Sequence, residues 1–303
     1  MTEARYMLVV SHTGRRESLD AAAGVVTRLA EAGVTPVLLE EEREDLLAAC
    51  GDFGGAVRMF DGMDASLLEL VIVLGGDGTI LRAAEIVRGS SVPLLGVNLG
   101  HIGFLAEAER EDLGETLRRV LARDYDVEER MTIDVAVKVD GEIAYTSWAL
   151  NEATIEKASR ERMLEVVMEI NGRPLSTFGC DGVVLSTPTG STAYAFSGGG
   201  PVVWPNVEAI LVVPLAAHAL FARPLVVGPT STVAVEVLQR TNGSGILFCD
   251  GRRTETLPPG ARVEVRRSGT PVRLARLQRG VFTDRLVRKF DLPVSGWRGP
   301  AGA

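Results

Sequence analysis

Two glycines and an aspartate follow a short apolar stretch directly, in the run VIVLGGDGTILR at residues 71–82. Glycine lets the backbone approach a ligand closely, and the amides at the start of the following helix attract an anion. Asp77 would repel a phosphate, so it indicates a second task there, either binding a metal ion or taking a proton from an attacking hydroxyl. The run predicts a kinase of a small molecule. The structural alternative is that Asp77 only caps the helix.

A second dense motif covers residues 179–201, with the sequence GCDGVVLSTPTGSTAYAFSGGGP. Its hydroxyl groups and open amides can cap a short helix or hold phosphate and ribose oxygens, and Tyr194 offers a ring for stacking. An elaborate turn with good capping is the structural alternative. The density of Gly, Ser and Thr in an otherwise apolar region favours a binding role.

A third candidate is the pair Asn151 and Glu152, which ends a strand-like segment at residues 145–150. An amide beside a carboxylate suits sugar hydroxyls or an adenine edge, although solvated strand ends often carry such a pair. The basic residues that follow could bind a pyrophosphate; they are Lys157, Arg160 and Arg162. This pair gains weight only together with the other two motifs.

Several common sites are missing from the sequence. It has no G-x-x-x-x-G-K-[ST] run, and Gly96, Gly100 and Gly103 have the wrong spacing for a dinucleotide fingerprint. Ser191 lacks the context of a hydrolase nucleophile. The three histidines lack metal-ligand spacing, and of them His101, in a glycine-rich loop, is the best placed to touch a ligand.

Composition bounds the class of protein. The chain has 303 residues, 46% of them hydrophobic, which allows two domains of ordinary size. A formal net charge of -8 and the lack of polybasic clusters argue against nucleic-acid and membrane-surface partners. Cys50, Cys180 and Cys249 fit neither a zinc site nor a disulfide framework, which favours the cytoplasm, and no apolar stretch reaches bilayer length.

The first part of the chain alternates strand-like and helix-like pieces, which predicts an α/β domain with a parallel sheet over residues 1–126. The expected strands are 7–11, 35–39, 71–74 and 93–98, and the expected helices are 18–32, 79–87 and 110–122. Ligands of such sheets bind beyond the carboxyl ends of the strands, where Asp77 falls. We interpret the acidic run 40–45 and the arginines of the C-terminal third as solvated faces.

Short β-branched segments follow, and they predict a predominantly β domain over residues 127–281. Asp140-Gly141 and Asn171-Gly172 each separate two such segments, so both predict tight hairpins. The remaining expected strands are 183–186, 210–213, 233–238, 246–249 and 262–266. Residues 282–303 contain a helix-like piece, 283–290, that we expect to return to the first domain.

Taken together, these motifs resemble the NAD kinase family over nearly the whole chain and in the right order. The resemblance rests on LGGDGT at 74–79, GVNLGHIGFL at 96–105, Asn151-Glu152, the motif at 179–201 and PLAAHALFARP at 214–224. LGGDGT is shared with lipid kinases and phosphofructokinases, whereas the motif at 179–201 is more particular. The family transfers a phosphoryl group, usually from ATP with a divalent metal, to the 2′-hydroxyl of the adenosine ribose of NAD.

The resemblance implies roles for particular residues. Asp77 resembles the proton acceptor, and Gly78 and Arg82 resemble substrate-contacting positions. Asn151 and Glu152 look like the dinucleotide clamp, Arg162 lies near a basic contact, and Asp181 is similar to an acid that reaches NAD across a subunit interface. The expected adenosine and backbone contacts are Thr192, Ala193, Tyr194, Ala195, Phe196, Ser197 and Ala216.

The sequence also departs from the family pattern. Asp250-Gly251-Arg252 stands where the family often has Asp-Gly-Gln, and Ala216-Ala217 replaces a bulkier pair. The implied mechanism places NAD between the two domains, with Asp77 taking the proton of the attacking hydroxyl. Mg²⁺ delivered with ATP is the expected cofactor, polyphosphate is an alternative donor, and a homodimer or homotetramer is expected. A lipid kinase of the diacylglycerol type and a dinucleotide-sensing module without turnover are the alternative functions.

Overall fold

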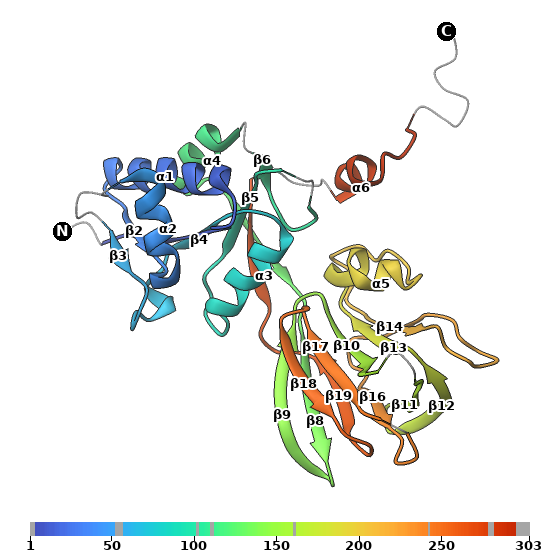
Figure 1. Ribbon diagram of the computed structural model, residues 1–303. Helices are drawn as coiled ribbons and strands as arrows, with labels where there is room; N and C mark the ends of the chain where they lie inside the picture. Colours follow the sequence, from blue (N-terminus) through green and yellow to red (C-terminus); the bar gives the residue numbers. More distant parts are fainter. Residues whose placement is uncertain are drawn as a thin grey trace, which may run out of the picture. The chain divides into compact units, whose positions relative to one another are not determined.

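The computed structural model describes residues 4–51, 57–100, 103–109, 112–159, 162–241, 243–277 and 282–294. Figure 1 shows two compact units, of which the first contains Met1–Glu129 and Val272–Ala303 and the second contains Arg130–Pro271. Each unit has its own buried apolar core. The second unit is therefore an insertion, and both ends of the chain belong to the first.

The first unit is an α/β unit, as the sequence predicts. Its strands are β1 (Tyr6–Ser11), β2 (Thr35–Leu38), β3 (Arg58–Met59), β4 (Leu70–Leu74), β5 (Leu94–Asn98), β6 (Ala108–Glu109), β7 (Asp126–Arg130) and β20 (Val272–Arg276). Its helices are α1 (Arg16–Glu31), α2 (Glu40–Cys50), α3 (Asp77–Ile86), α4 (Leu113–Leu121) and α6 (Phe282–Phe290), with a 3-10 turn η1 (Ala65–Leu67).

The sheet order is β3-β2-β1-β4-β5-β20-β7, with β6 beside β5. The pairs β1–β2, β1–β4 and β4–β5 are parallel, which confirms the predicted sheet. Every residue of β4 and of β5 is buried, as expected for a parallel sheet whose two faces are covered. Ser11 pairs with Leu74, and Leu74 with Val97, so β1, β4 and β5 end side by side and the loops after them share one edge.

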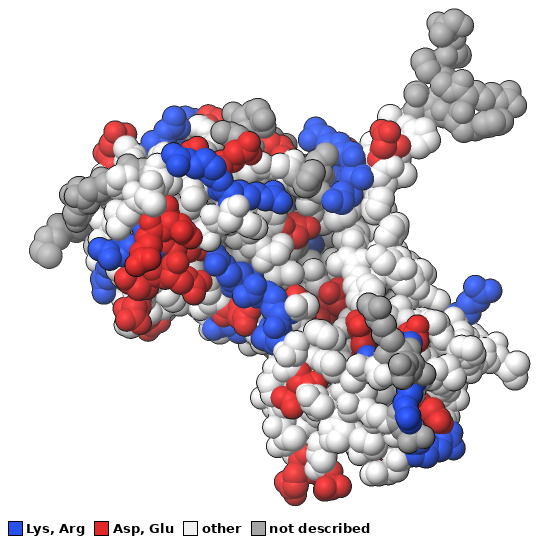
Figure 2. Space-filling view, in the orientation of Figure 1, with Lys and Arg blue, Asp and Glu red and all other residues white. Residues whose placement is uncertain are grey.

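The helices differ from the prediction in detail. The predicted helix 18–32 is Arg16–Glu31, the one at 79–87 begins at Asp77, and the one at 110–122 is Leu113–Leu121, with residues 110 and 111 outside the described part. Helix α2 was not predicted. Most of its acids are exposed and form the red cluster over α2 in Figure 2, but Glu42 is buried. Because Glu42 puts a carboxylate on the buried face of α2, the sequence there lacks the regular spacing of apolar residues that predicts a helix.

The domain boundaries also differ from the prediction. β20, expected in the β domain, joins the sheet of the first unit, where Leu274 pairs with Leu94 and Ala275 lies in the core. β7 joins the same sheet, so the first unit extends to Glu129. A short apolar strand carries no sign of which sheet it will join, and only pairing partners far away in the sequence decide it.

The second unit consists of two six-stranded sheets whose strand pairs are antiparallel. One contains β8 (Ile133–Val139), β9 (Glu142–Ala149), β11 (Leu164–Ile170), β12 (Arg173–Cys180), β16 (Val233–Val237) and β19 (Arg262–Arg267). The other contains β10 (Glu152–Lys157), β13 (Gly182–Ser186), β14 (Ile210–Leu215), β15 (Leu225–Val227), β17 (Gly245–Cys249) and β18 (Arg253–Leu257). Two short helical pieces complete it, η3 (Thr189–Thr192) and α5 (Tyr194–Ser197).

Both predicted hairpins are confirmed. Asp140-Gly141 joins β8 to β9 and Asn171-Gly172 joins β11 to β12, each with two successive positive φ angles, as tight hairpin turns require. Residues of both sheets, such as Val135 and Ile155, belong to one buried cluster, so the two sheets pack face to face. In the parts of the chain that are described, no helix is long and apolar enough to cross a membrane.

Candidate active site

The turn between β4 and α3 leaves the start of a helix open. Gly76 occupies the N-cap position with no side chain to cap it, and both Gly76 and Gly78 are exposed. The N–H groups of Thr79 and Ile80 already donate to the Gly76 carbonyl, at 3.0 and 3.2 Å. The helix dipole and the earlier amides of such a turn attract an anion, as the sequence predicts for this position.

The carboxylate of Asp77 does not cap α3. Its Oδ2 accepts a hydrogen bond of 3.0 Å from the N–H of Phe104, and its Oδ1 accepts one of 3.1 Å from the N–H of Leu105. The side chain is half-buried. The loop after β5 thus fixes the direction of this carboxylate beside the open helix end, which is the arrangement a positioned proton acceptor needs.

Gly103 leaves the room that the Asp77 carboxylate occupies. A Cβ atom at residue 103 would lie 2.3 Å from Oδ1 of Asp77, so a side chain there must displace the carboxylate. We expect Gly103→Ala to lower kcat by roughly 10- to 100-fold, because catalysis is sensitive to displacements of about 1 Å. Steady-state kinetics of the phosphoryl transfer that the sequence resemblance implies measure this. Gly24→Ala, at a helix position with open space, is the control and should leave kcat unchanged.

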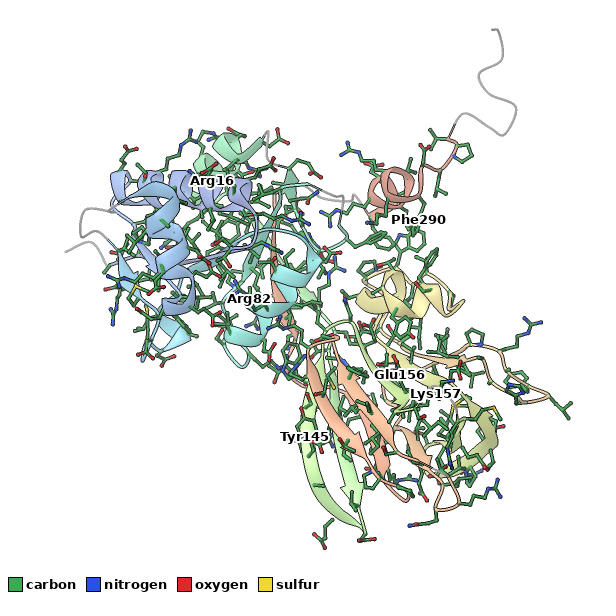
Figure 3. All side chains as sticks on the ribbon, in the orientation of Figure 1. Arg16, Arg82, Tyr145, Glu156, Lys157 and Phe290 are labelled. Atoms are coloured by element: carbon green, nitrogen blue, oxygen red, sulfur yellow. The ribbon has the colours of Figure 1, made fainter. Side chains whose placement is uncertain are left out.

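Arg82, expected to contact the substrate, is labelled on α3 in Figure 3. Its described contacts lie within the first unit. Its guanidinium donates to the Ser11 carbonyl at 2.9 Å and forms an ion pair with the buried Glu42 and a longer one, of 3.3 Å, with Glu41. Glu42 also accepts 2.9 Å hydrogen bonds from the N–H and hydroxyl of Ser11, and burial raises the pKa of this carboxyl. Arg82 therefore joins α3 to α2 and to the end of β1.

In the second unit, Asp250 organises the chain that carries Asn151 and Glu152. This buried carboxylate accepts backbone N–H bonds from Leu150 at 2.9 Å, Asn151 at 2.7 Å and Glu152 at 3.3 Å. It also forms a 2.7 Å ion pair with Arg253. Burial raises the pKa of Asp250, and the three amides and Arg253 oppose that rise. One aspartate thus fixes the backbone of the predicted dinucleotide clamp.

The hydroxyl groups of the motif at 179–201 support the same segment from the other side. Thr187 Oγ1 donates to the Leu150 carbonyl at 2.5 Å, and Ser186 Oγ donates to the Asn151 carbonyl at 3.1 Å. A Cβ atom at residue 190 would lie 2.1 Å from that Asn151 oxygen, so only glycine fits there. Ser186 and Thr187 are fully buried, so these hydroxyls shape the site instead of facing a ligand.

Asn151 and Glu152 each have a buried side-chain oxygen atom that is available to a ligand. Among the described residues, neither Oδ1 of Asn151 nor Oε2 of Glu152 has a hydrogen-bond partner, although both atoms are buried. Burial raises the pKa of Glu152 to about 8, the charge of Asp250 adds to the rise, and the N–H of Tyr194 opposes it. At neutral pH this carboxyl is therefore mainly protonated. An unpartnered acceptor beside a protonated carboxyl fits a ligand with hydroxyl groups.

The raised pKa of Glu152 makes the stability of the protein depend on pH. The folded state holds this proton until the pH approaches 8, whereas the unfolded chain releases it near 4.5, so stability falls as pH rises through that window. Glu152→Gln removes this contribution to the pH dependence. We compare the free energy of unfolding of Glu152→Gln with that of wild type at each pH. This difference should shift in favour of the variant by roughly 2 to 4 kcal/mol from about pH 5 to about pH 9.

Urea denaturation of both proteins at the two pH values tests this expectation. Glu142→Gln is the matched control, because Glu142 is exposed in a hairpin and should keep the wild-type pH dependence. Parallel stability curves for wild type and Glu152→Gln would contradict the raised pKa.

Other predicted residues lie along the same sheet as Glu152. The Tyr194 hydroxyl bonds to Glu156, while Asp181 and Lys157 form an ion pair of 2.5 Å; Figure 3 marks Glu156 and Lys157 on β10. Tyr194 begins α5, and this residue is 39% exposed. The short helix also contains a buried Ala195 and exposed Phe196 and Ser197, and follows the half-buried Thr192 and Ala193.

Two predicted contacts lie outside this group. Ala216 is exposed and has a φ of 46°, a left-handed conformation that is rare for alanine and is typical of positions with a special backbone role. Arg162 is exposed, and no described contact ties it to the clamp. His101 lies outside the described residues.

Comparison with known proteins decides the family. The model of the ATP-NAD kinase N-terminal domain matches residues 7–125, and that of the ATP-NAD kinase C-terminal domain matches residues 150–277. An NAD kinase of Leifsonia xyli subsp. xyli is 66% identical over 302 residues, which cover 100% of this chain and 99% of the relative. NAD kinase 2 of Streptomyces coelicolor is 59% identical over 298 residues, 97% of each chain.

The chain belongs to the NAD kinase family.

Solved structures of the NAD kinase family share the fold. Yeast NADH kinase, crystallised with NADH, superposes with a TM-score of 0.87 at 21% identity, over 98% of this chain and 90% of that one. An NAD kinase from Archaeoglobus fulgidus in complex with ATP gives 0.69 at 22% identity, over 95% and 98%. The predicted fold class, a parallel α/β unit plus a mainly antiparallel β unit, is that of these NAD kinases.

Sequence reasoning missed two parts of this NAD kinase site. The Asp250 carboxylate attracted notice only through its neighbour Arg252, which is exposed. The motif at 96–105 contains the Phe104–Leu105 turn, but nothing in the sequence indicates that this turn holds Asp77. The Asp250 carboxylate and the Phe104–Leu105 turn both act through backbone N–H groups, which the sequence does not distinguish. For Asp250, the Asp-Gly pair after the predicted strand 246–249 is the feature that could have indicated a special role.

Proposed function

We propose that this protein transfers the γ-phosphoryl group of ATP to the 2′-hydroxyl of the adenosine ribose of NAD, forming NADP. The observation that supports this proposal most directly is the position of the Asp77 carboxylate, which two backbone N–H groups hold beside the open start of α3. The names of relatives up to 66% identical over the whole chain support the choice of NAD as acceptor. Phosphoryl transfer needs a positioned acceptor and compensation of charge, and this turn offers both.

In the proposed reaction, Asp77 takes the proton of the 2′-hydroxyl while that oxygen bonds to the γ-phosphorus. The bond between the γ-phosphorus and the bridging oxygen breaks, and ADP leaves. The α3 N-terminus, with Gly78 leaving room for close approach, partly neutralises the phosphate charge. Mg²⁺ belongs to the donor in this scheme, as its complex with ATP, because kinases use metal ions bound to the transferred phosphates.

The second unit would bind the dinucleotide. Asn151 Oδ1 can accept a hydrogen bond and the protonated Glu152 can donate one, which suits neighbouring ribose hydroxyls. The exposed rings of Tyr194 and Phe196 suit stacking on a base. We assign Arg162, Asp181 and Ala216 further contacts with NAD by their positions in the motifs, with Asp181 acting from a second copy of the chain.

We also propose a homodimer or homotetramer in the cytoplasm. The second unit exposes large apolar side chains, among them Leu220, Phe221 and Val226, and exposed apolar groups of this kind favour association. Cys180 and Cys249 are free thiols, as a reducing compartment allows. Sedimentation equilibrium of the purified protein measures the size of the assembly.

The test is to incubate the full chain with NAD, ATP and Mg²⁺ and to measure NADP with an NADP-specific dehydrogenase. Parallel reactions replace ATP by polyphosphate, or NAD by a diacylglycerol emulsion. We expect NADP with ATP. Phosphorylated lipid without NADP would favour a lipid kinase, and tight binding of NAD without turnover would favour a sensing module.

A further inference from the structure

The Phe104–Leu105 turn is hydrogen-bonded on both of its sides. Its two N–H groups donate to Asp77, at 3.0 and 3.1 Å. Its two carbonyl groups accept from arginines, Phe104 O from Arg285 Nη1 at 2.9 Å and Leu105 O from Arg276 Nη1 at 3.3 Å. Hydrogen bonds therefore restrain both the N–H groups and the carbonyl groups of the turn. Because the N–H groups donate to Asp77, they also restrain its carboxylate.

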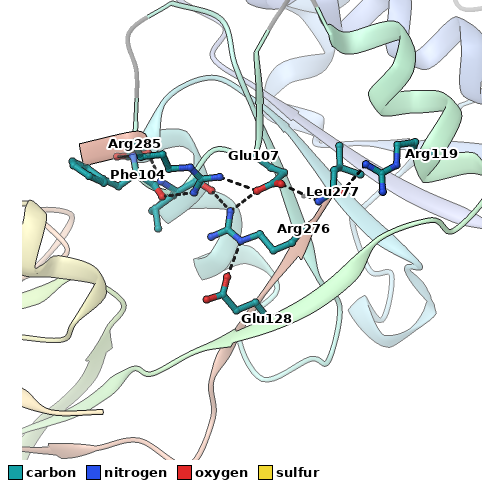
Figure 4. A network of polar contacts seen from close by, with 9 residues as sticks. Phe104, Glu107, Arg119, Glu128, Arg276, Leu277 and Arg285 are labelled. Atoms are coloured by element: carbon teal, nitrogen blue, oxygen red, sulfur yellow. Dashed lines mark hydrogen bonds and ion pairs between the residues drawn. The ribbon is translucent and has the colours of Figure 1, made fainter. Parts of the chain in front are cut away.

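The two arginines converge on one buried carboxylate, as Figure 4 shows. Oε2 of Glu107 lies 2.9 Å from Arg276 Nη1 and 2.8 Å from Arg285 Nη2, and Oε1 accepts the N–H of Leu277 at 2.9 Å. The Glu107 side chain is 3% exposed, and Arg276 also pairs with Glu128 at 2.8 Å. Buried charges persist only where they are paired and hydrogen-bonded in this way.

Aromatic packing fixes the helix that supplies Arg285. The Phe104 ring lies 5.9 Å from that of Phe282 and 6.1 Å from that of Phe290, between centroids, and both partners belong to α6. The Arg285 side chain is 16% exposed. Burial, followed by the like charge of Arg276, lowers the pKa of Arg285, which agrees with two guanidinium groups held close together. The turn therefore sits between α6 and the Asp77 carboxylate.

We propose that Arg285, with Arg276 and Glu107, positions the Asp77 carboxylate for proton transfer by holding the carbonyl groups of the Phe104–Leu105 turn. Arg285 is a positioning residue and does not touch the substrate in this scheme. The inference rests on the proposed function, because it takes Asp77 as the proton acceptor. It assigns the C-terminal helix α6 a part in catalysis, although α6 follows Asp77 by some two hundred positions in the chain.

Arg285→Ala removes the bond to Phe104 O and leaves Glu107 paired with Arg276. We expect kcat to fall by about 10- to 100-fold, since catalysis is sensitive to displacements of about 1 Å, and the KM for NAD to change little. Arg285→Lys keeps the charge but can reach only one of the two acceptors well, so it should recover part of kcat. A purely structural role predicts no such split between kcat and KM.

Arg5→Ala is the matched control in the same unit. Arg5 likewise contacts one carboxylate and one carbonyl away from the turn: it donates two hydrogen bonds to Glu69, at 2.7 and 2.6 Å, and one of 3.1 Å to Leu121 O. It should cost a similar amount of stability and leave kcat unchanged. Equal kcat values for Arg285→Ala and Arg5→Ala would overturn the proposal.

Amide hydrogen exchange tests the same inference without any assay of activity. In Arg285→Ala the N–H groups of Phe104 and Leu105 should exchange about tenfold faster than in wild type, because their bonds to Asp77 loosen, while Arg5→Ala should keep the wild-type rates. Unchanged exchange would overturn the proposal. If wild type forms no NADP, the proposed function fails, and exchange still decides whether the arginines hold the turn. If Arg285→Ala does not fold, Arg285→Lys provides both measurements.

Discussion

Asp77→Asn should lower kcat by about 10²- to 10⁴-fold, with a much smaller effect on the KM for NAD. The asparagine has the same shape, but its amide cannot take the proton of the attacking hydroxyl. It also presents an NH₂ group to one of the two donors, Phe104 N–H or Leu105 N–H, so one of the two bonds is lost. Steady-state kinetics of NADP formation give both constants.

Asp64→Asn is the control for this change. Asp64 lies in the same unit, and its carboxylate accepts the Ser66 N–H at 2.8 Å at an exposed 3-10 turn. The variant makes the same chemical change away from the proposed site and should keep wild-type kcat. Near-normal turnover of Asp77→Asn would reject Asp77 as the proton acceptor.

Asp250→Ala should lower the free energy of unfolding by roughly 3 to 5 kcal/mol, the range for breaking a buried ion pair. The substitution leaves the N–H groups of Leu150, Asn151 and Glu152 and the guanidinium of Arg253 without this acceptor. Because the clamp backbone loses its support, we also expect a raised KM for NAD. Urea denaturation measures the first effect and kinetics the second.

Asp140→Ala is the control that separates the loss of the Asp250 carboxylate from the cost of placing alanine at a positive φ angle. Asp140 and Asp250 both precede a glycine and have nearly equal positive φ angles, 51° and 52°, but Asp140 is exposed in a hairpin. The cost of placing alanine at positive φ is thus common to both variants. Equal losses of stability would show that the Asp250 carboxylate contributes little.

Local patterns predicted the fold class because they record local physics. The apolar run 71–74 predicted a buried parallel strand, and Asp140-Gly141 and Asn171-Gly172 predicted hairpins whose positive φ angles these residues tolerate. The glycines around Asp77 likewise predicted an open turn. In each case the residues that decide the conformation are neighbours in the chain, so the sequence shows them together.

Buried charges escaped prediction because charged residues usually lie at the surface. The acidic run and the C-terminal arginines were interpreted as solvated faces, yet Glu42 is 1% exposed and Arg276 is 8% exposed. Each is buried only because a partner distant in the sequence compensates it, Arg82 in one case and Glu107 and Glu128 in the other. Neither the composition of the sequence nor the spacing of its apolar residues indicates such ion pairs.

The sequence by itself determined which residues are available for chemistry: a carboxylate between glycines after a strand, an Asn-Glu pair, and a motif rich in hydroxyl groups. The tertiary structure decided what holds them. Asp77 meets Phe104 N–H across 27 residues, Asn151 N–H meets Asp250 across 99, and Arg285 meets Glu107 across 178. Hydrogen bonds and ion pairs act over about 3 Å in space, whatever their separation in the chain, so only the folded backbone shows which groups they join.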